Sequence, residues 1–496
     1  MSNQNWDYDV IIIGGGGAGI AAAIEALNAG ATVLLCEAAQ RVGGSAANSG
    51  GVIMAAGSDI QESRGIQDSV DDLYNYYMTV NHNEVEPALA RRLCEGGVPT
   101  LDWLRSYGVS FNPDALYVTG IENPKAPRGH PATGMGAAIM EALSQAALSQ
   151  KGLEVAVRTR VTELLVEDGR VRGIRSPGAV VRAAAVVITT GGFGNNFELL
   201  QRYYPAAARH GKEWHIYVGI KENQGDGLTM GMAAGAAIVG DGSGQCLYTA
   251  SFSKEVEPYL PGWLVFVNKE GFRFIDETPA YVLTDNVLNA QPDAICFALM
   301  DHAAFTREPK DPKYRSKGFL EFPTPNWTPE MLARHLANGK VHKGITLQEL
   351  GRSAGIAPEG LAATIETYNG DCAAGRDAHY RKAASFLLPL DKPPFYAVEL
   401  RPTCVGTTHT GLRIDVETRV IGRNGRPIAG LYAAGECTGG VMKYYAGGGN
   451  SLLNNFVFGR VAGRNAAALA RAAAEQARAL SSDQQPRTGL PRQSQS

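Results

Sequence analysis

The sequence predicts an α/β fold in which a parallel-sheet domain is divided along the chain by an inserted α+β capping domain. The apolar run of residues 10–13 is followed at once by glycines and then by an Ala-rich helical stretch that ends at Gly30. A second apolar run, residues 31–36, completes a β-α-β unit, which belongs to parallel sheets. Between residues 243 and 400 this alternation is lost and Pro and aromatic residues become frequent, and it returns near residue 430.

Four segments follow from this pattern. Residues 1–242 and 401–475 are expected to form the two parts of the divided domain, and residues 243–400 the capping domain. A closing helix is expected to start at Gly459. Residues 476–496 are rich in Ser, Gln, Pro and Arg and are expected to be a disordered tail.

Composition excludes several classes of function. The 496 residues include 46 Lys and Arg against 49 Asp and Glu, a net charge of −3, which argues against a nucleic-acid binder. No apolar run reaches the roughly 18–20 residues that span a bilayer. The seven cysteines are scattered without a CxxC spacing, so we expect neither disulfides nor a metal site. Residues 1–9 do not resemble a secretory signal, and a cytoplasmic location is expected.

A glycine motif connects the first strand and helix. Residues 14–19 match GxGxxG: Gly14 permits the tight turn, Gly16 lets the backbone approach a pyrophosphate, and Gly19 allows close packing of helix on strand. The helix N-terminus then offers free N–H groups to the phosphates. Glu37 ends the second strand, about 20 residues on, where an acid binds ribose hydroxyls. This context favours a dinucleotide over a glycine-rich turn without a ligand.

Further glycine motifs distinguish between dinucleotides. They occupy residues 43–51, 190–192, 225–227 and 434–436. The series resembles the FAD-binding pattern of the fumarate reductase/succinate dehydrogenase flavoprotein superfamily over nearly the whole chain. The resemblance implies a Rossmann-like FAD-binding domain that is split in sequence and carries an inserted capping domain.

The resemblance also implies the contacts of the cofactor, with Glu37 on the adenosine ribose and Ser45 near the pyrophosphate and flavin. Some superfamily members attach FAD covalently through a His near Ser45, but residues 44–49 contain none, so we expect non-covalent FAD. The implied cofactor-binding residues are Gly14, Gly16, Ala18, Gly19, Glu37, Gly44, Ser45, Ser49, Gly50, Gly51, Val161, Gly191, Asp226, Glu436, Ser451 and Leu452.

Members of the superfamily move a hydride between the flavin and a carbon next to an activating group. Fumarate reductases hold a dicarboxylate with Arg and His and use an Arg as the proton donor. In the matching stretches here, Ser451 stands where that Arg would be, Met442 near the His, and Tyr281 in place of another Arg. Because bidentate Arg is the usual receptor for carboxylates, these replacements argue against fumarate or succinate.

The residues that stand there instead resemble the 3-ketosteroid dehydrogenases and 4-oxocyclohexanecarboxylate dehydrogenase. The resemblance implies that Tyr281 and Tyr445 are catalytic and that the N–H of Gly449 binds the substrate carbonyl. We assign Tyr281 as the base and Tyr445 as the carbonyl polariser, although the two roles are interchangeable at this stage. Since the pKa of free tyrosine is near 10, a tyrosine base needs surroundings that stabilise its anion. Tyr117 is a third candidate, with packing as its alternative.

The roles of three other residues remain undecided at this stage. Tyr444 competes with its neighbour Tyr445. Arg128 either meets a substrate carboxylate or lies at the surface or the FAD. His409 either hydrogen-bonds the flavin or packs in the interior.

The expected function is that of an FAD-dependent dehydrogenase that forms a C=C bond next to a ring ketone. The substrate is a 3-ketosteroid or a small oxocyclohexane such as 4-oxocyclohexanecarboxylate, and O₂, a quinone or another acceptor removes the electrons. Two alternatives remain: a reductase of an enone or acrylate, and a non-enzymatic FAD electron carrier.

Overall fold

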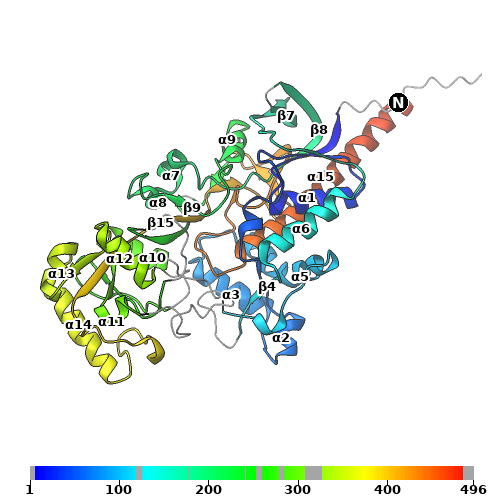
Figure 1. The fold of residues 1–496 in the computed structure, drawn as a ribbon. Coiled ribbons are helices and arrows are strands. Elements are labelled where there is room, and N and C mark those ends of the chain that lie inside the picture. The colour runs from blue at the N-terminus through cyan, green and yellow to red at the C-terminus, as the bar shows by residue number, and fades with distance from the viewer. Residues whose placement is uncertain are drawn as a thin grey trace, which may run out of the picture.

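The computed structural model describes residues 6–118, 126–176, 178–240, 242–252, 260–278, 284–307 and 327–483. Tyr281 lies outside these residues. The chain forms two bodies, a larger one from its N- and C-terminal parts and a smaller one from its middle (Figure 1). Both contain helices and strands, which confirms the predicted α/β class.

A largely parallel sheet forms the centre of the larger body. Neighbouring strands β1, β2, β5 and β8 are all parallel, and β18 is parallel to β8. Their carboxyl ends therefore meet at one edge, where ligands of open α/β sheets bind. In spatial order the strands are β17 (Arg419–Ile421), β18 (Pro427–Ala433), β7 (Arg170–Ser176), β8 (Ala179–Ile188), β1 (Tyr8–Ile13), β2 (Val33–Cys36) and β5 (Leu153–Ala156), with β6 (Glu163–Glu167) paired to β7.

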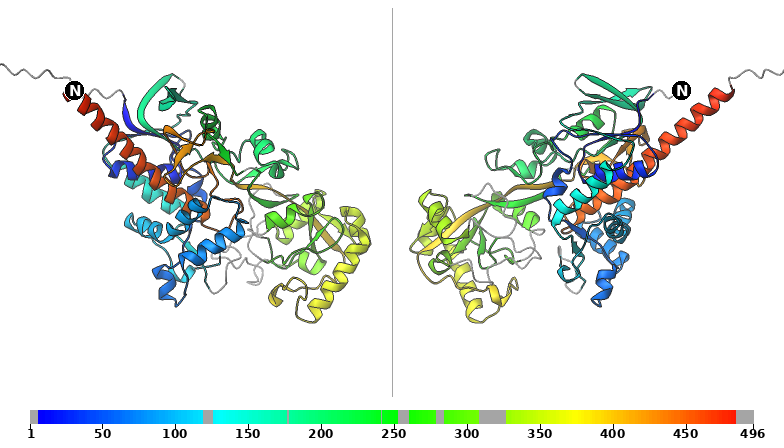
Figure 2. Two further views of the ribbon diagram at one scale, coloured as in Figure 1. Left: turned by 180° about the vertical axis from the view of Figure 1, so that it is seen from behind. Right: turned by 45° about the vertical axis from the view of Figure 1, so that its right-hand side comes forward.

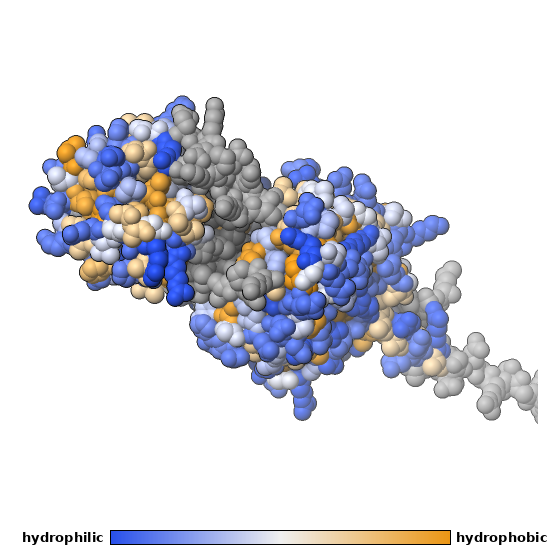
Figure 3. All heavy atoms as spheres, turned by 90° about the horizontal axis from the view of Figure 1, so that it is seen from below, coloured by the Kyte–Doolittle hydropathy of each residue, from blue (hydrophilic) through white to orange (hydrophobic). Residues whose placement is uncertain are grey.

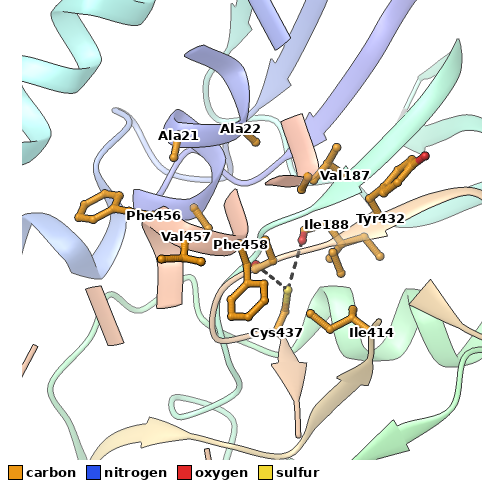
Figure 4. Packing of buried hydrophobic residues seen from close by; sticks show 14 of the residues in the cluster. Ala21, Ala22, Val187, Ile188, Ile414, Tyr432, Cys437, Phe456, Val457 and Phe458 are labelled. Atoms are coloured by element: carbon orange, nitrogen blue, oxygen red, sulfur yellow. Dashed lines mark hydrogen bonds between the residues drawn. The ribbon is translucent and has the colours of Figure 1, made fainter. Parts of the chain in front are cut away.

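Two helices, α1 (Gly17–Asn28) and α15 (Asn450–Asp483), pack closely against each other beside this sheet. The contact depends on small residues, because a Cβ on Gly463 would lie 2.1 Å from the carbonyl oxygen of Ala22. Figure 4 shows Ala21 and Ala22 facing the first turns of α15. In the same core, Cys437 Sγ donates to the carbonyl oxygen of Ile188 over 3.3 Å.

Helix α15 is longer than the closing helix expected from Gly459. It starts nine residues earlier in the chain, at Asn450, because the first turns pack on the core, and it continues to Asp483. It therefore passes residue 476, where the sequence had indicated the start of a disordered tail; the Ala-rich composition there has high helix propensity. The C-terminal end of α15 projects beyond the body (Figure 2).

Further elements complete the larger body. A two-stranded antiparallel sheet joins β3 (Val52–Met54) to β4 (Gly129–Pro131). A three-stranded sheet contains β10 (Ile238–Val239), β16 (Gly411–Arg413) and β19 (Thr438–Gly439). The helices are η1 (Gly44–Asn48), α2 (Asp59–Ser63), α3 (Val70–Val80), α4 (Pro87–Glu95), α5 (Gly97–Ser106), η2 (Pro113–Ala115), α6 (Met135–Leu148), α7 (Phe197–Tyr203), α8 (Pro205–Ala208) and α9 (Asp226–Ala233).

The smaller body is built on a six-stranded sheet. Its strands are β11 (Gly244–Ala250), β15 (Phe395–Thr408), β13 (Cys296–Met300), β12 (Val265–Asn268), β14 (His342–Gly344) and β9 (Ile216–Tyr217). Its helices are α10 (Thr284–Asn289), η3 (Pro292–Ala294), α11 (His302–Phe305), α12 (Pro329–Ala337), α13 (Leu347–Ala354), α14 (Pro358–Ala373) and η6 (Ala384–Phe386).

Both faces of this sheet are buried. Because successive side chains of a strand point to opposite faces, Phe266 joins one hydrophobic cluster and its neighbour Val265 joins another. Strand β15 is 14 residues long and runs without a break past residue 400, the proposed boundary of the capping domain, into the larger body. Figure 2 shows it crossing between the two bodies.

The surface drawn in Figure 3 is mainly hydrophilic, and its apolar residues lie in small separate groups. Among the described residues, no helix combines the length and apolar character that crossing a membrane requires.

Candidate functional site

A cleft of about 750 Å³ opens at the carboxyl edge of the parallel sheet, where β1, β2, β8 and β18 end. Most of the cofactor-binding residues implied by the sequence line it: Gly14, Gly16, Ala18, Glu37, Gly44, Ser45, Val161, Gly191, Asp226 and Glu436. Residues from both halves of the divided sequence therefore meet in one cleft.

The turn between β1 and α1 forms one wall of this cleft. A Cβ on Gly19 would lie 1.9 Å from the carbonyl oxygen of Gly14, so only glycine lets the helix start this close to the strand. Gly16 caps α1 without a side-chain hydrogen bond, and the first turn of the helix contains no acidic residue. The free N–H groups and partial positive charge of this helix end suit a pyrophosphate.

Glu37 lies directly after β2 and is 4% exposed. Its Oε2 accepts a hydrogen bond from the Gly15 N–H over 2.7 Å, and its Oε1 accepts one from the Ala39 N–H over 2.7 Å. A carboxylate has about four acceptor positions, so each oxygen keeps one for a further donor. The arrangement fits an acid that fixes the glycine turn and accepts ribose hydroxyls.

A hydrogen-bonded group from three segments closes another side of the cleft. Ser45 Oγ accepts hydrogen bonds from the Ile220 N–H over 3.1 Å and from Asn223 Nδ2 over 3.3 Å. Asn223 Nδ2 also lies 2.5 Å from the hydroxyl of Tyr217. Sequence reasoning missed Asn223, and its position three residues before Asp226 was the only signal that could have indicated it.

Two further carboxylates line the cleft. Glu436 Oε1 accepts hydrogen bonds from the N–H and the hydroxyl of Thr408, at 2.9 and 3.1 Å, although burial raises the pKa of this carboxyl. Asp226, the first residue of α9, forms a 2.6 Å ion pair with Arg160, a cleft residue that the sequence did not indicate.

Three buried polar atoms lie at the start of α15, on residues that do not line the cleft. Asn450 Oδ1, Ser451 Oγ and Asn454 Oδ1 have no hydrogen-bond partner among the described residues. An unpaired buried polar atom costs about 1–3 kcal/mol, so these atoms would take a hydrogen bond from water or from a bound group. The residues that fit FAD are those of the cleft itself, the glycine turn at the start of α1 and Glu37.

Other implied cofactor residues pack around the cleft and do not line it. Gly19 contacts Gly14, as expected, and Ser49 Oγ donates to the carbonyl oxygen of Ala46 over 2.7 Å. Leu452 is 6% exposed and belongs to the hydrophobic core. The others outside the lining are Gly50, Gly51 and Ser451.

Tyr445 and Gly449 belong to the loop between β19 and α15. Tyr445 is half-buried. Gly449 has φ +100°, and a Cβ there would lie 2.7 Å from the backbone nitrogen of Met54, so the loop is packed directly against β3. Any other residue would be strained in this conformation and would push the loop away from β3.

Tyr117 approaches the same region from the other side of the small sheet. Its backbone pairs with Gly129 through two hydrogen bonds of 3.1 and 3.3 Å. Gly129 in β4 is in turn the register partner of Met54 in β3. Tyr117, β4, β3 and Gly449 therefore follow one another across this sheet.

A buried charge cluster includes Arg273 and Glu277, which precede Tyr281 in the chain. Glu277 pairs with Arg273 over 2.8 Å and with Lys382 over 3.1 Å, and Arg273 also pairs with Asp377 over 2.8 Å. Burial acts to raise the pKa of Glu277, but the charges of Lys382 and Arg273 outweigh it and the pKa is lowered. The cluster fixes the backbone up to the edge of the described residues.

The residues whose roles the sequence left open have definite partners in the structure. Arg128 makes a bidentate ion pair with Asp68 at 2.7 and 2.8 Å, so its guanidinium already holds a carboxylate. His409 Nδ1 bonds the carbonyl oxygen of Lys443 and Nε2 the hydroxyl of Thr407, both over 3.0 Å. Burial lowers the pKa of His409 to about 4. The ring of Tyr444 packs on that of His82, 4.7 Å away.

Comparison with known proteins identifies the family. Residues 9–452 match the model of the FAD binding domain family. The chain belongs to this family of the fumarate reductase/succinate dehydrogenase flavoproteins. It is an FAD-dependent oxidoreductase whose relatives act on C=C or CH–CH bonds, which confirms the cofactor and the enzyme class expected from the sequence.

Named relatives include reductases and a dehydrogenase. The chain is 30% identical to the probable fumarate reductase Ifc3 of Shewanella frigidimarina, over 92% of this chain and 74% of that protein. It is 27% identical to the NADH:fumarate oxidoreductase of Klebsiella pneumoniae, over 94% of this chain, and spans only 48% of that relative. The structure of 3-ketosteroid-Δ4-(5α)-dehydrogenase from Rhodococcus jostii RHA1 with 4-androstene-3,17-dione matches with a TM-score of 0.74 and 28% identity, over 94% of this chain and 98% of that one.

Proposed function

We propose that the protein is an FAD-dependent dehydrogenase that forms a C=C bond α,β to a ring ketone. The substrate is a 3-ketosteroid or a small oxocyclohexane such as 4-oxocyclohexanecarboxylate. The observation that carries the proposal is the uncharged set Tyr445, Gly449 and Ser451 at the start of α15, where the resemblance to fumarate reductases calls for an arginine. The likeness to a ketosteroid dehydrogenase structure at 28% identity supports it.

Two donors from one loop act on the substrate carbonyl. The O–H of Tyr445 and the N–H of Gly449 donate hydrogen bonds to the carbonyl oxygen and stabilise the negative charge that develops there as the α-carbon loses its proton. Contact of Gly449 with β3 holds its N–H in place, so the donor needs no reorganisation during the reaction. A backbone N–H and a phenol suit a neutral ketone better than a carboxylate.

The proton and the electron pair leave from adjacent carbons. The base, assigned to Tyr281, takes the α-proton, and the electron pair of that C–H bond becomes the new C=C bond. When bound, FAD supplies the acceptor for the hydride that leaves the β-carbon. The two electrons then pass to an external acceptor such as O₂ or a quinone.

The charges near the loop also support a substrate with at most one carboxylate. Arg128 is occupied by Asp68, and the Lys443 ammonium lies 2.8 Å from Glu84. A dicarboxylate would need two cationic receptors. The arginines that the fumarate reductase pattern requires are replaced here by Ser451 and Tyr281.

A reductase of an enone or acrylate is the second candidate, and the 30% identity to a probable fumarate reductase favours it. It uses the same residues in the reverse direction, with the phenols returning a proton to the α-carbon. A non-enzymatic electron carrier is the third. In either direction the proposal assumes a cytoplasmic protein, in which the seven free cysteines stay reduced.

Anaerobic stopped-flow spectroscopy distinguishes these candidates. The holoprotein is mixed with androstanedione-type steroids or with 4-oxocyclohexanecarboxylate, and products are identified by mass. Bleaching of the flavin by a saturated ketone, with a product two hydrogens lighter, is the expected result. Reoxidation of dithionite-reduced protein by fumarate or an enone, without bleaching by any ketone, would favour the reductase. No change of the flavin spectrum with either kind of compound would leave the non-enzymatic electron carrier as the remaining candidate.

A further inference from the structure

The loop that carries Tyr445 is held from one side by α3 and the residue that follows it. Asn81 is the C-cap of α3 and is 0% exposed. Its Oδ1 accepts hydrogen bonds from the backbone N–H groups of Lys443, over 2.7 Å, and Tyr444, over 2.9 Å. Its Nδ2 donates to the carbonyl oxygen of Tyr77 over 2.9 Å. One buried amide therefore ties two consecutive peptide groups of the loop, immediately before Tyr445, to the end of a helix.

Two tyrosines of α3 hold the carbonyl groups on either side. The hydroxyl of Tyr77 donates to the carbonyl oxygen of Val441 over 2.8 Å, and that of Tyr76 donates to Ala446. Burial, together with the nearby Cys94 and Tyr445, holds the pKa of Tyr77 well above its ordinary value, so this phenol keeps its proton. The backbone is thus fixed both before and after Tyr445.

A contact from the opposite direction completes the arrangement. His409, at the end of β15, is 2% exposed and its Nδ1 lies 3.0 Å from the carbonyl oxygen of Lys443. The peptide group between Lys443 and Tyr444 is therefore bonded at its carbonyl by His409 and at its N–H by Asn81. Asn81 and Lys443 are separated by 362 positions in the sequence, and no motif marks Asn81 or Tyr76.

We propose that Asn81 is a positioning residue for Tyr445: it fixes the loop backbone so that the phenol reaches the substrate carbonyl, and Tyr76 assists it. The proposal rests on the role of Tyr445 under the proposed function. Asn81 does not touch the substrate. If its amide is replaced by an apolar side chain, two buried N–H groups lose their acceptor, and the loop turns to recover hydrogen bonds. The hydroxyl of Tyr445 then leaves its working position.

A double-mutant cycle tests this relation, with the panel ketone that gives the fastest flavin reduction. Tyr445→Phe alone is expected to lower kcat about 100-fold, the scale of losing one such donor. Asn81→Leu is expected to lower kcat at least roughly 10-fold in the native background but less than about 2-fold in the Tyr445→Phe background, because residues that act as one unit are not additive. Tyr76→Phe removes a single hydroxyl, preserves the fold if Asn81→Leu does not, and is expected to be non-additive with Tyr445→Phe in the same way.

A second readout follows the loop itself. In the holoprotein, Asn81→Leu is expected to speed hydrogen–deuterium exchange of the Lys443 and Tyr444 amides, with the affinity for FAD unchanged. Thr79→Ala is the matched control, because this exposed hydroxyl on the same helix donates to the carbonyl oxygen of Asn75, over 2.7 Å, and to no other group among the described residues. It is expected to change neither exchange nor kcat.

The possible results separate the two proposals. Additive losses from Asn81→Leu and Tyr445→Phe, unchanged loop exchange, or a native kcat in Asn81→Leu would overturn the positioning role and leave the proposed function standing. Full activity of Tyr445→Phe, or no turnover of any ketone by the native protein, would overturn the role of Tyr445 and the positioning role with it.

Discussion

The cofactor side and the substrate side of the site are constructed differently. The cofactor side is made mainly of backbone groups at strand ends, and much of it comes from the short segment of residues 14–19 with Glu37 close behind. The proposed substrate side is assembled from α3, the end of β15 and the loop before α15, and α3 is far from the other two in the chain. The first side is specified by local glycine geometry. The second depends on the packing of whole elements, so its chemistry can change while the first stays as it is.

The largest expected effect is on the cofactor side. In Gly19→Ala the new Cβ would lie 1.9 Å from the carbonyl oxygen of Gly14, so the turn must open and the pyrophosphate site is lost. We expect the purified variant to be colourless and inactive. FAD is measured after precipitation with trichloroacetic acid, and in the native protein all of it is expected in the supernatant, because residues 44–49 contain no His. Flavin in the native pellet would contradict non-covalent binding.

The next largest effect is expected on turnover alone, with the cofactor side left intact. Tyr281→Phe is expected to leave FAD bound but to lower turnover at least about 100-fold, the scale of losing a general base. Tyr444→Phe is the control, because the ring of Tyr444 packs on His82 instead. Flavin content and kcat are measured on both. Near-normal turnover of Tyr281→Phe would remove it from the base role, and a large loss in Tyr444→Phe would transfer the role of Tyr445 to its neighbour.

Low pH is expected to lower the free energy of unfolding through two buried histidines, His130 and His409. Burial lowers the pKa of both His130 and His409 from 6.5 to about 4. Between these values the unfolded chain binds more protons than the folded one, so stability falls as the pH is lowered through this window. At pH 5 each histidine is expected to cost about 2 kcal/mol of unfolding free energy relative to pH 8.

Urea unfolding at pH 5 and pH 8 measures this loss. In His130→Gln, which keeps polar groups near Ser58 and the carbonyl of Arg128, the loss of unfolding free energy between pH 8 and pH 5 is expected to be smaller by about 2 kcal/mol. His302→Gln, at an exposed position of the smaller body, is the control and should behave as the native protein does. Equal pH dependence of the unfolding free energy in all three proteins would contradict the contribution assigned to His130.

The smallest effect is again on the cofactor side. In Glu37→Gln one carboxylate oxygen remains as an acceptor, but the new NH₂ group points at one of the two backbone N–H groups that Glu37 binds, so two donors face each other. The affinity for FAD is therefore expected to fall roughly 10-fold. Titration of the apoprotein with FAD measures it by flavin fluorescence. Glu163→Gln, at an exposed position on β6, should have native affinity. An unchanged affinity in Glu37→Gln would mean that this carboxylate only supports the glycine turn.

The sequence predicted the cofactor side well because its signals are local. The strand, glycine turn, helix and acid follow one another within about 30 residues, and each has one structural role. The α/β class and the membership of the flavoprotein superfamily are confirmed, whereas the assignment to its ketosteroid dehydrogenase group stays a prediction. The contacts of individual residues stay predictions, although the cleft brings together Glu37, Ser45, Asp226 and Glu436 from segments on both sides of the middle body.

The substrate side was predicted only where a family motif covered it. Asn81 and Tyr76 have no sequence signature, because their roles come from which backbone groups lie opposite them in the folded chain. For His409 two roles had been left open, and its two ring nitrogens bond Thr407 and Lys443. Arg128 had been a candidate carboxylate receptor, but its partner Asp68, 60 positions away, could not be identified from spacing.

The 14-residue strand β15 has a mechanical consequence. At about 3.3 Å per residue, its 14 residues extend over roughly 46 Å. The strand starts in the smaller body at Phe395 and ends at Thr408, whose N–H donates a hydrogen bond to Glu436. Its pairing with β11 shifts register between Gln245 and Cys246 and again between Leu247 and Tyr248, where a ladder bends most readily. Strand β15 therefore connects the core of the smaller body, through the hydrogen bond of Thr408, to a carboxylate that lines the cofactor cleft.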